Sequence, residues 1–111
     1  MSNTVTSTIQ SKQQLQGLYN EMWAVTATID FASVAAGAES TESLTIPGVA
    51  LGDMVLGISS SVSLTATGEA SIDAYVSAAN TVMVCLSNLH ASSAVDLASS
   101  TWKILIGRPG W

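Results

Sequence analysis

The sequence predicts an all-β fold, either an antiparallel β-sandwich or a jelly-roll-like small barrel of about six to eight short strands. Apolar and polar residues alternate with a period of two along several short segments, as expected of strands that bury one face. Residues that favour turns separate these segments at near-regular spacing. The segment 71–88 holds two such strands with small residues between them, and the other apolar segments must pack on or beside this pair.

The segment 71–88 is predicted to be a β-hairpin. One set of alternating positions is Ile72, Ala74, Val76, Val82, Val84 and Leu86, and the opposite set includes Tyr75, Met83 and Cys85. Asn80 tolerates the left-handed backbone that a tight reversal requires, and we expect a loop of about three to five residues. Because Tyr75 and Met83 make the second face partly apolar, we expect another subunit to cover it.

Four further segments have the character of strands: residues 24–31, 43–46, 52–58 and 100–107. Pro47-Gly48 is a strong turn signal after the second of them. The positions that share a face are Val25, Ala27, Ile29 and Phe31 in the first, Met54, Leu56 and Ile58 in the third, and Trp102, Ile104 and Ile106 in the last. We expect the core to contain Ile29, Phe31, Val84, Leu86, Trp102 and Ile104.

The first 23 residues predict an N-terminal arm and a short amphipathic helix, followed by a β-sandwich domain over residues 24–111. Residues 1–8 are polar and show no periodicity. Leu15, Leu18, Tyr19 and Met22 have the spacing of one helical stripe, although Gly17 costs about 1 kcal/mol inside a helix. Because so short a helix is marginal alone, we expect its stripe to lie against its own domain or a neighbouring subunit.

The composition excludes several classes of function. Charged residues make up only 10% of the 111 residues, against about a quarter in typical domains, and the net charge is −5. An acidic chain with three basic residues does not form a phosphate-binding patch, so we expect no nucleic-acid partner. Apolar residues account for 48% of the chain, yet no window resembles a membrane span. Large buried contacts between subunits explain the low charge most simply.

The start of the chain shows no signal peptide, and its single cysteine forms no intrachain disulfide. Both features suit synthesis in the cytoplasm.

The sequence predicts no catalytic, cofactor or metal site. Cys85, His90 and Asp96 are close in sequence and have the residue types of a nucleophilic triad, but no nucleophile turn accompanies them. One histidine and one cysteine do not complete a four-ligand zinc site. The glycines match neither dinucleotide-binding nor P-loop spacing. A loop histidine and a buried or interface thiol are the favoured interpretations.

The aromatic residues are candidates for contacts. Trp102 alternates with isoleucines and is expected in the core, and Trp23 is expected at the junction of helix and sheet. Trp111, the last residue in the sequence, either folds back or inserts into a neighbour. Aromatic and long apolar side chains are common interface anchors. The candidate interface residues are Leu15, Leu18, Tyr19, Met22, Tyr75, Met83 and Trp111.

Four segments in order, 27–37, 46–53, 75–82 and 94–102, carry a resemblance to a known family. They read ATIDFASVAAG, IPGVALGD, YVSAANTV and AVDLASSTW. Together they resemble a small β domain of virion structural proteins of tailed bacteriophages, which include capsid cement or decoration proteins and head or tail fibre parts. The resemblance covers residues 27–106 and implies a non-enzymatic, oligomeric virion component with a β-sandwich fold.

The favoured hypothesis is a capsid cement protein made in the host cytoplasm and located on the capsid exterior. The resemblance implies that it assembles with itself, as a trimer, and binds over junctions between major capsid protein subunits. One alternative is a fibre or tail-associated module that contacts the host surface. Another is a small hydrolase that uses Cys85 or a serine as its nucleophile.

Overall fold

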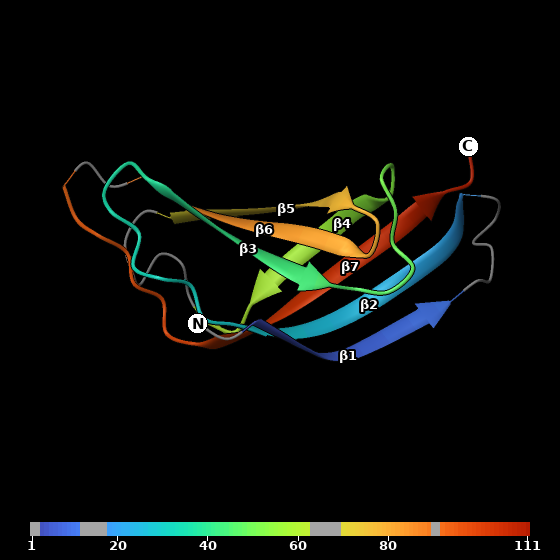
Figure 1. The fold of residues 1–111 in the computed structure, drawn as a ribbon, viewed down its shortest axis with the longest axis horizontal. Coiled ribbons are helices and arrows are strands. Elements are labelled where there is room, and N and C mark those ends of the chain that lie inside the picture. The colour runs from blue at the N-terminus through green and yellow to red at the C-terminus, as the bar shows by residue number, and fades with distance from the viewer. Residues whose placement is uncertain (1–2, 12–17, 63–69, 90–91) are drawn as a thin grey trace.

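The computed structural model describes residues 3–11, 18–62, 70–89 and 92–111 and shows an all-β sandwich (Figure 1). Within these residues the strands form two antiparallel sheets, with no helix. The strands are β1 (Asn3–Ser11), β2 (Tyr19–Ile29), β3 (Glu39–Thr45), β4 (Met54–Ser60), β5 (Ala70–Ala78), β6 (Thr81–Asn88) and β7 (Ser100–Pro109). The sandwich predicted from the alternating pattern is therefore confirmed.

The larger sheet has the strand order β1-β2-β7-β4 (Figure 1). Its two central strands pair along almost their whole length, with Ala27 opposite Trp102 and Trp23 opposite Ile106. Both strands alternate buried and more exposed residues, because successive side chains of a strand point to opposite faces. The sequence faces predicted for residues 24–31 and 100–107 are thus confirmed.

The smaller sheet has the order β3-β6-β5 and contains the predicted hairpin. Only Ala79 and Asn80 separate its strands, so the expected loop of three to five residues is wrong. Asn80 adopts a left-handed φ of 61°, which permits the tighter reversal. The ladder register shifts between Val76 and Ala78.

The core lies between the two sheets. Phe31 and Trp102 meet edge to face, with ring centroids 5.8 Å apart, an arrangement favoured by the ring quadrupoles. All six residues predicted for the core are buried. The buried apolar cluster also includes five residues outside the strands that were not predicted for the core, namely Val34, Ile46, Val49, Val95 and Leu97.

One end of the sandwich is closed by loops rather than strands. Val34 and Val95 form an isolated antiparallel bridge, with N–O distances of 2.7 and 2.9 Å. Buried Asn88 donates through Nδ2 to the carbonyls of Val34 and Ser93. These bonds hold two long loops against the core and satisfy polar groups that would be costly to bury alone.

The prediction of an N-terminal arm and a short helix is wrong for the residues of this segment that the structure describes. Residues 3–11 form β1, and residues 19–23 begin β2, with which β1 pairs. Trp23 is fully buried in that strand, not at a helix–sheet junction, and the predicted boundary between residues 23 and 24 falls inside β2. The threonines, Val5 and Ile9 of β1 have strand propensity, and the pairing overrides the short helical stripe. Leu15 lies outside the described residues.

The face predicted for residues 52–58 is wrong at its start. Met54 is exposed, whereas Val55 and Ile58 pack against the core. The pairing shows why: Val55 is opposite Ile106 and Gly57 is opposite Leu105, so the strand bulges at Leu56. One extra residue reverses the alternation on either side of it.

Candidate interaction surfaces

The predicted interface residues divide between opposite sides of the sandwich. Tyr19 and Met22 belong to β2 in the larger sheet, and Trp111 contacts Tyr19. Tyr75 and Met83 are paired neighbours in the smaller sheet. Leu18 is 54% exposed beside the start of β2. The interface residues predicted from the sequence therefore belong to two separate surfaces.

The C-terminal residues fold back on the start of β2. Gly110 donates its N–H to the carbonyl of Leu18 at 2.8 Å. The Tyr19 and Trp111 rings meet edge to face at 5.7 Å, yet Trp111 remains 75% exposed. A Cβ atom on Gly107 would lie 2.7 Å from Tyr19 Cδ1. The absence of a side chain at residue 107 thus allows this aromatic pair to lie close to the sheet.

The outer face of the larger sheet, here called the four-stranded face, consists of cross-strand rows with little charge. Its rows follow from the strand register. Among these outward-facing residues, Lys103 alone carries a charge. The rows are Thr4, Thr28 and Thr101; then Ser7, Thr26, Lys103 and Ser59; then Ile9, Ala24, Leu105 and Gly57; and finally Met22, Gly107 and Met54, where the Tyr19 ring lies over the buried Gly107.

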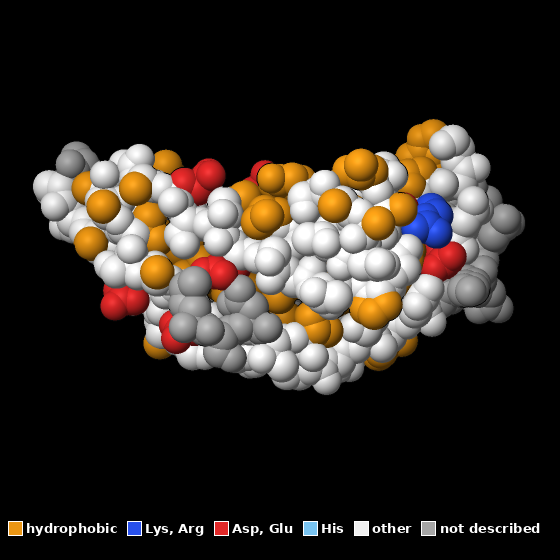
Figure 2. Space-filling view, in the orientation of Figure 1, with side chains coloured by type: hydrophobic (Ala, Val, Ile, Leu, Met, Phe, Trp, Pro, Cys, Tyr) orange, Lys and Arg blue, Asp and Glu red, His pale blue; other side chains and the backbone are white. Residues whose placement is uncertain are grey.

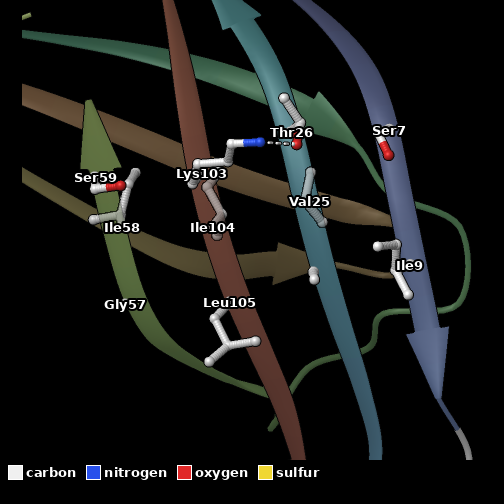
Figure 3. A pocket seen from close by; sticks show the side chains of 11 residues that line it. Ser7, Ile9, Val25, Thr26, Gly57, Ile58, Ser59, Lys103, Ile104 and Leu105 are labelled. Atoms are coloured by element: carbon white, nitrogen blue, oxygen red, sulfur yellow. Dashed lines mark hydrogen bonds between the residues drawn. The ribbon is translucent and has the colours of Figure 1, made fainter. Parts of the chain in front are cut away.

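A shallow groove of about 480 Å³ crosses the middle of the four-stranded face. Figure 3 shows Ile9 and Leu105 projecting on either side of β2, with no side chain at Gly57. Ile9 is 69% exposed and Leu105 is 41% exposed. Because large residues alternate with Ala24 and Gly57 along this row, the surface has two projections and two hollows.

Lys103 lies on the polar side of this groove. Its Nζ donates to Thr26 Oγ1 at 2.9 Å (Figure 3). This bond joins β7 to β2 and keeps the ammonium group close to the middle of the sheet. The four-stranded face thus has an apolar half around Leu105 and a hydroxyl-rich half around Lys103.

The outer face of the smaller sheet, here called the three-stranded face, has the opposite charge. Tyr75 is 51% exposed and lies beside Met83, while Asp73 and Glu39 supply acidic groups. Figure 2 shows one view of the surface, on which hydrophobic side chains lie among uncharged areas, with separate acidic groups and one Lys/Arg group at the end where β7 ends. The three-stranded face therefore combines apolar contact area with negative charge.

Cys85 lies on the three-stranded face opposite Asp73 and Thr41. Burial raises the pKa of its thiol, and the negative charges of Glu39 and Asp73 raise the pKa further. Thiols react as thiolates, so these surroundings disfavour Cys85 as a nucleophile. Asp96 is exposed on a loop, and His90 lies outside the described residues.

Arg108 forms a charge cluster that sequence reasoning missed. Its Nε and one terminal nitrogen each lie 2.9 Å from an oxygen of Asp53, and the other terminal nitrogen lies 3.3 Å from Glu21. The guanidinium also donates to the Gly48 carbonyl at 2.8 Å and lies 5.2 Å from the Trp23 ring centroid. The hydrogen bond to Asp53 raises the pKa of Arg108 despite its desolvation. The cluster joins β2, β7 and the turn before β4.

Two searches of the described part of the chain concern metal ions and membranes. Across residues 3–11, 18–62, 70–89 and 92–111, no three His, Cys, Asp or Glu side chains are grouped so as to hold a metal ion. The same residues include no helix with the length and hydropathy of a membrane span.

Comparison with known proteins gives this chain no relative. No protein-family model matches the sequence, and no curated protein or solved structure shows significant similarity to it.

Proposed function

We propose that this protein is a structural component of a tailed-bacteriophage virion, a capsid cement protein that assembles with itself and binds over junctions between major capsid protein subunits. It would be made in the host cytoplasm and would lie on the capsid exterior. It would act through surface contacts rather than through a catalytic centre.

The main support is the way the four resembling segments contact one another in pairs. In residues 46–53 and 75–82, Asn80 N–H donates to Val49 O at 2.8 Å, and Asn80 Oδ1 accepts from Gly48 N–H at 2.9 Å. In residues 27–37 and 94–102, Val34 bridges Val95. The residues of the four segments thus make contacts that hold the loops of the sandwich together, and this placement supports the proposal.

The two outer faces supply a second line of support. Both faces expose large apolar side chains, and contiguous exposed apolar area of this kind is typical of surfaces that partners cover. The three-stranded face, with Tyr75, Met83 and Asp73, is the surface we assign to a virion partner. The four-stranded face remains available for a second contact.

The test is to mix the purified protein with phage particles that lack it, sediment the particles and determine a density map at side-chain resolution. We expect density over the junctions of the major capsid protein. Tyr75→Ala should reduce co-sedimentation, whereas Asp96→Ala on an exposed loop serves as the control. Thermal melting confirms that both variants are folded.

Two results would contradict this function. Density confined to the tail or to a fibre would favour the adhesion module instead. Failure to co-sediment with any particle of the phage that encodes the protein would remove the virion role altogether.

A further inference from the structure

We infer that the four-stranded face binds the same face of a second copy, through a two-fold axis parallel to the strands and midway between β2 and β7. This inference builds on the self-assembly in the proposed function but names the surface, the symmetry and the residues. It gives a dimer as the elementary contact, in place of the trimer implied by the resemblance.

The need for a cover follows from the composition of this face. Ile9, Met54 and Leu105 are exposed to between 41% and 69%, and Lys103 is the single charged residue among the rows of the face. Sheet faces that remain in water ordinarily carry alternating polar and charged side chains. An apolar half-face of this kind is typical of an interaction site.

A second copy fits because the central row is complementary to itself. Across the sheet the row consists of Ile9, Ala24, Leu105 and Gly57. Its side chains are therefore large, small, large and absent, in that order. The two-fold axis reverses the row, so Leu105 lies over the partner's Ala24 and Ile9 lies over the partner's Gly57. Both projections then enter hollows. An isologous contact requires this self-complementarity.

The hollow at Gly57 is open. A Cβ atom built there meets nothing within 4 Å, so the partner's Ile9 encounters no atom that must move. The groove of about 480 Å³ has Ile9, Ala24, Gly57 and Leu105 among its lining residues. Two such grooves, one from each copy, would be filled by the four projections of the pair.

The available area suits a reversible dimer. Four strands about 4.8 Å apart and rows that extend for about 25 Å give on the order of 1,000 Å² of flat area for the two copies together. Stable complexes bury about 1,200–2,000 Å² of accessible surface, so this contact lies below that range, among the weak and transient ones. Aligned sheets packed about 10 Å apart would also diverge at their ends because both are twisted.

Lys103 supplies a signature of the proposed symmetry. Its Nζ lies toward β2, bonded to Thr26, so the axis brings the ammonium groups of both copies to the same side of the contact. They repel each other, and added salt screens the repulsion. The dimer should therefore strengthen as salt rises. Packing against the acidic three-stranded face of another copy would weaken instead.

The experiment measures the dissociation constant by analytical ultracentrifugation for the full chain and five variants. Leu105→Ala leaves a gap over the partner's Ala24, and Ala24→Leu sets two leucines against each other, so each should weaken association by about tenfold or more. The double variant restores a large residue opposite a small one and should return to within about threefold of the wild-type constant. Ser43→Leu adds the same side chain to the opposite face as a control.

Each outcome decides the inference. Unchanged association in both single variants, or a double variant no stronger than either, would overturn the two-fold contact, as would a trimer or an affinity that falls with salt. If Tyr75→Ala dissociates the oligomer while Ala24→Leu does not, self-assembly stands and uses another face. A monomer at tens of micromolar would remove self-assembly as well. Particle binding, measured separately, decides the virion role.

Discussion

Arg108 and Asp53 form a two-pronged ion pair, with two nitrogen–oxygen distances of 2.9 Å. The Asp53 side chain is 3% exposed and that of Arg108 is 32% exposed. Asp53 Oδ2 also accepts from the Ala50 N–H at 2.9 Å. One carboxylate therefore closes the turn before β4 and fixes the end of β7 to it.

Replacing Asp53 should destabilise the protein more than replacing a surface carboxylate. Asp53→Ala leaves the Ala50 N–H and the Arg108 guanidinium without their acceptor, which should cost about 2–4 kcal/mol of unfolding free energy. Asp96→Ala, at an exposed loop position, should stay within about 0.5 kcal/mol. Denaturant titration measures both. Equal losses would show that the ion pair contributes nothing specific.

Asn80 should show two separable contributions to stability. Its backbone has a φ of 61°, and its Oδ1 accepts from Gly48 N–H. Asn80→Gly removes only the side-chain bond and should cost about 1 kcal/mol. Asn80→Ala also loses the tolerance of left-handed backbone that the short polar side chain of asparagine gives, which adds roughly 1 kcal/mol. In thermal and denaturant unfolding, Asn80→Gly should be more stable than Asn80→Ala. The reverse order would contradict the turn geometry.

Trp102 should dominate the stability of the core. It is fully buried and its ring contacts Phe31, so Trp102→Ala should cost about 3–5 kcal/mol. Thr101→Ala, at the next, outward-facing position, should change stability by less than about 1 kcal/mol. Guanidinium titration of the two variants provides the comparison. A loss below about 1 kcal/mol at residue 102 would contradict the register of β7.

Cys85 should react slowly with thiol reagents near neutral pH. Burial and the nearby Glu39 and Asp73 raise its pKa, so the thiolate forms only at higher pH than in free cysteine. Asp73→Asn removes a repelling negative charge, lowers the pKa and should speed iodoacetamide labelling at fixed pH. Asp96→Asn serves as the control.

The pH profile of the labelling rate separates the pKa effect from simple access. A profile that shifts toward lower pH in Asp73→Asn is expected. A faster rate without that shift would mean that the substitution merely opens the face.

The sequence alone determined the sandwich, most strand faces and the main core residues. A period of two places alternate residues on opposite faces whatever their partners, so Ile29, Val84 and Trp102 could be assigned inward from local pattern. Asn80 was identified as the turn residue for an equally local reason, since its side chain tolerates left-handed backbone. The length of the hairpin loop could not be predicted from the sequence, because the register shift beside Ala78 depends on pairing between the strands.

The tertiary structure decided what local pattern leaves ambiguous. Residues 1–8 are polar and aperiodic in sequence, yet residues 3–11 form β1 because β2 offers an edge whose backbone groups need partners. The bulge at Leu56 reverses the faces of β4 through its pairing with β7. Val95 and Leu97 lie in a loop that small residues made look exposed, yet both are buried.

The candidate surfaces show the same division. Tyr75 and Met83 could be predicted together because one hairpin holds them. Ile9, Ala24, Leu105 and Gly57 come from four strands spread along the chain, and only the register of the sheet makes them one row. Arg108 and Asp53 are 55 residues apart, and each alone resembles an ordinary surface charge. Contacts between distant segments depend on strand order and register, which residue periodicity does not specify.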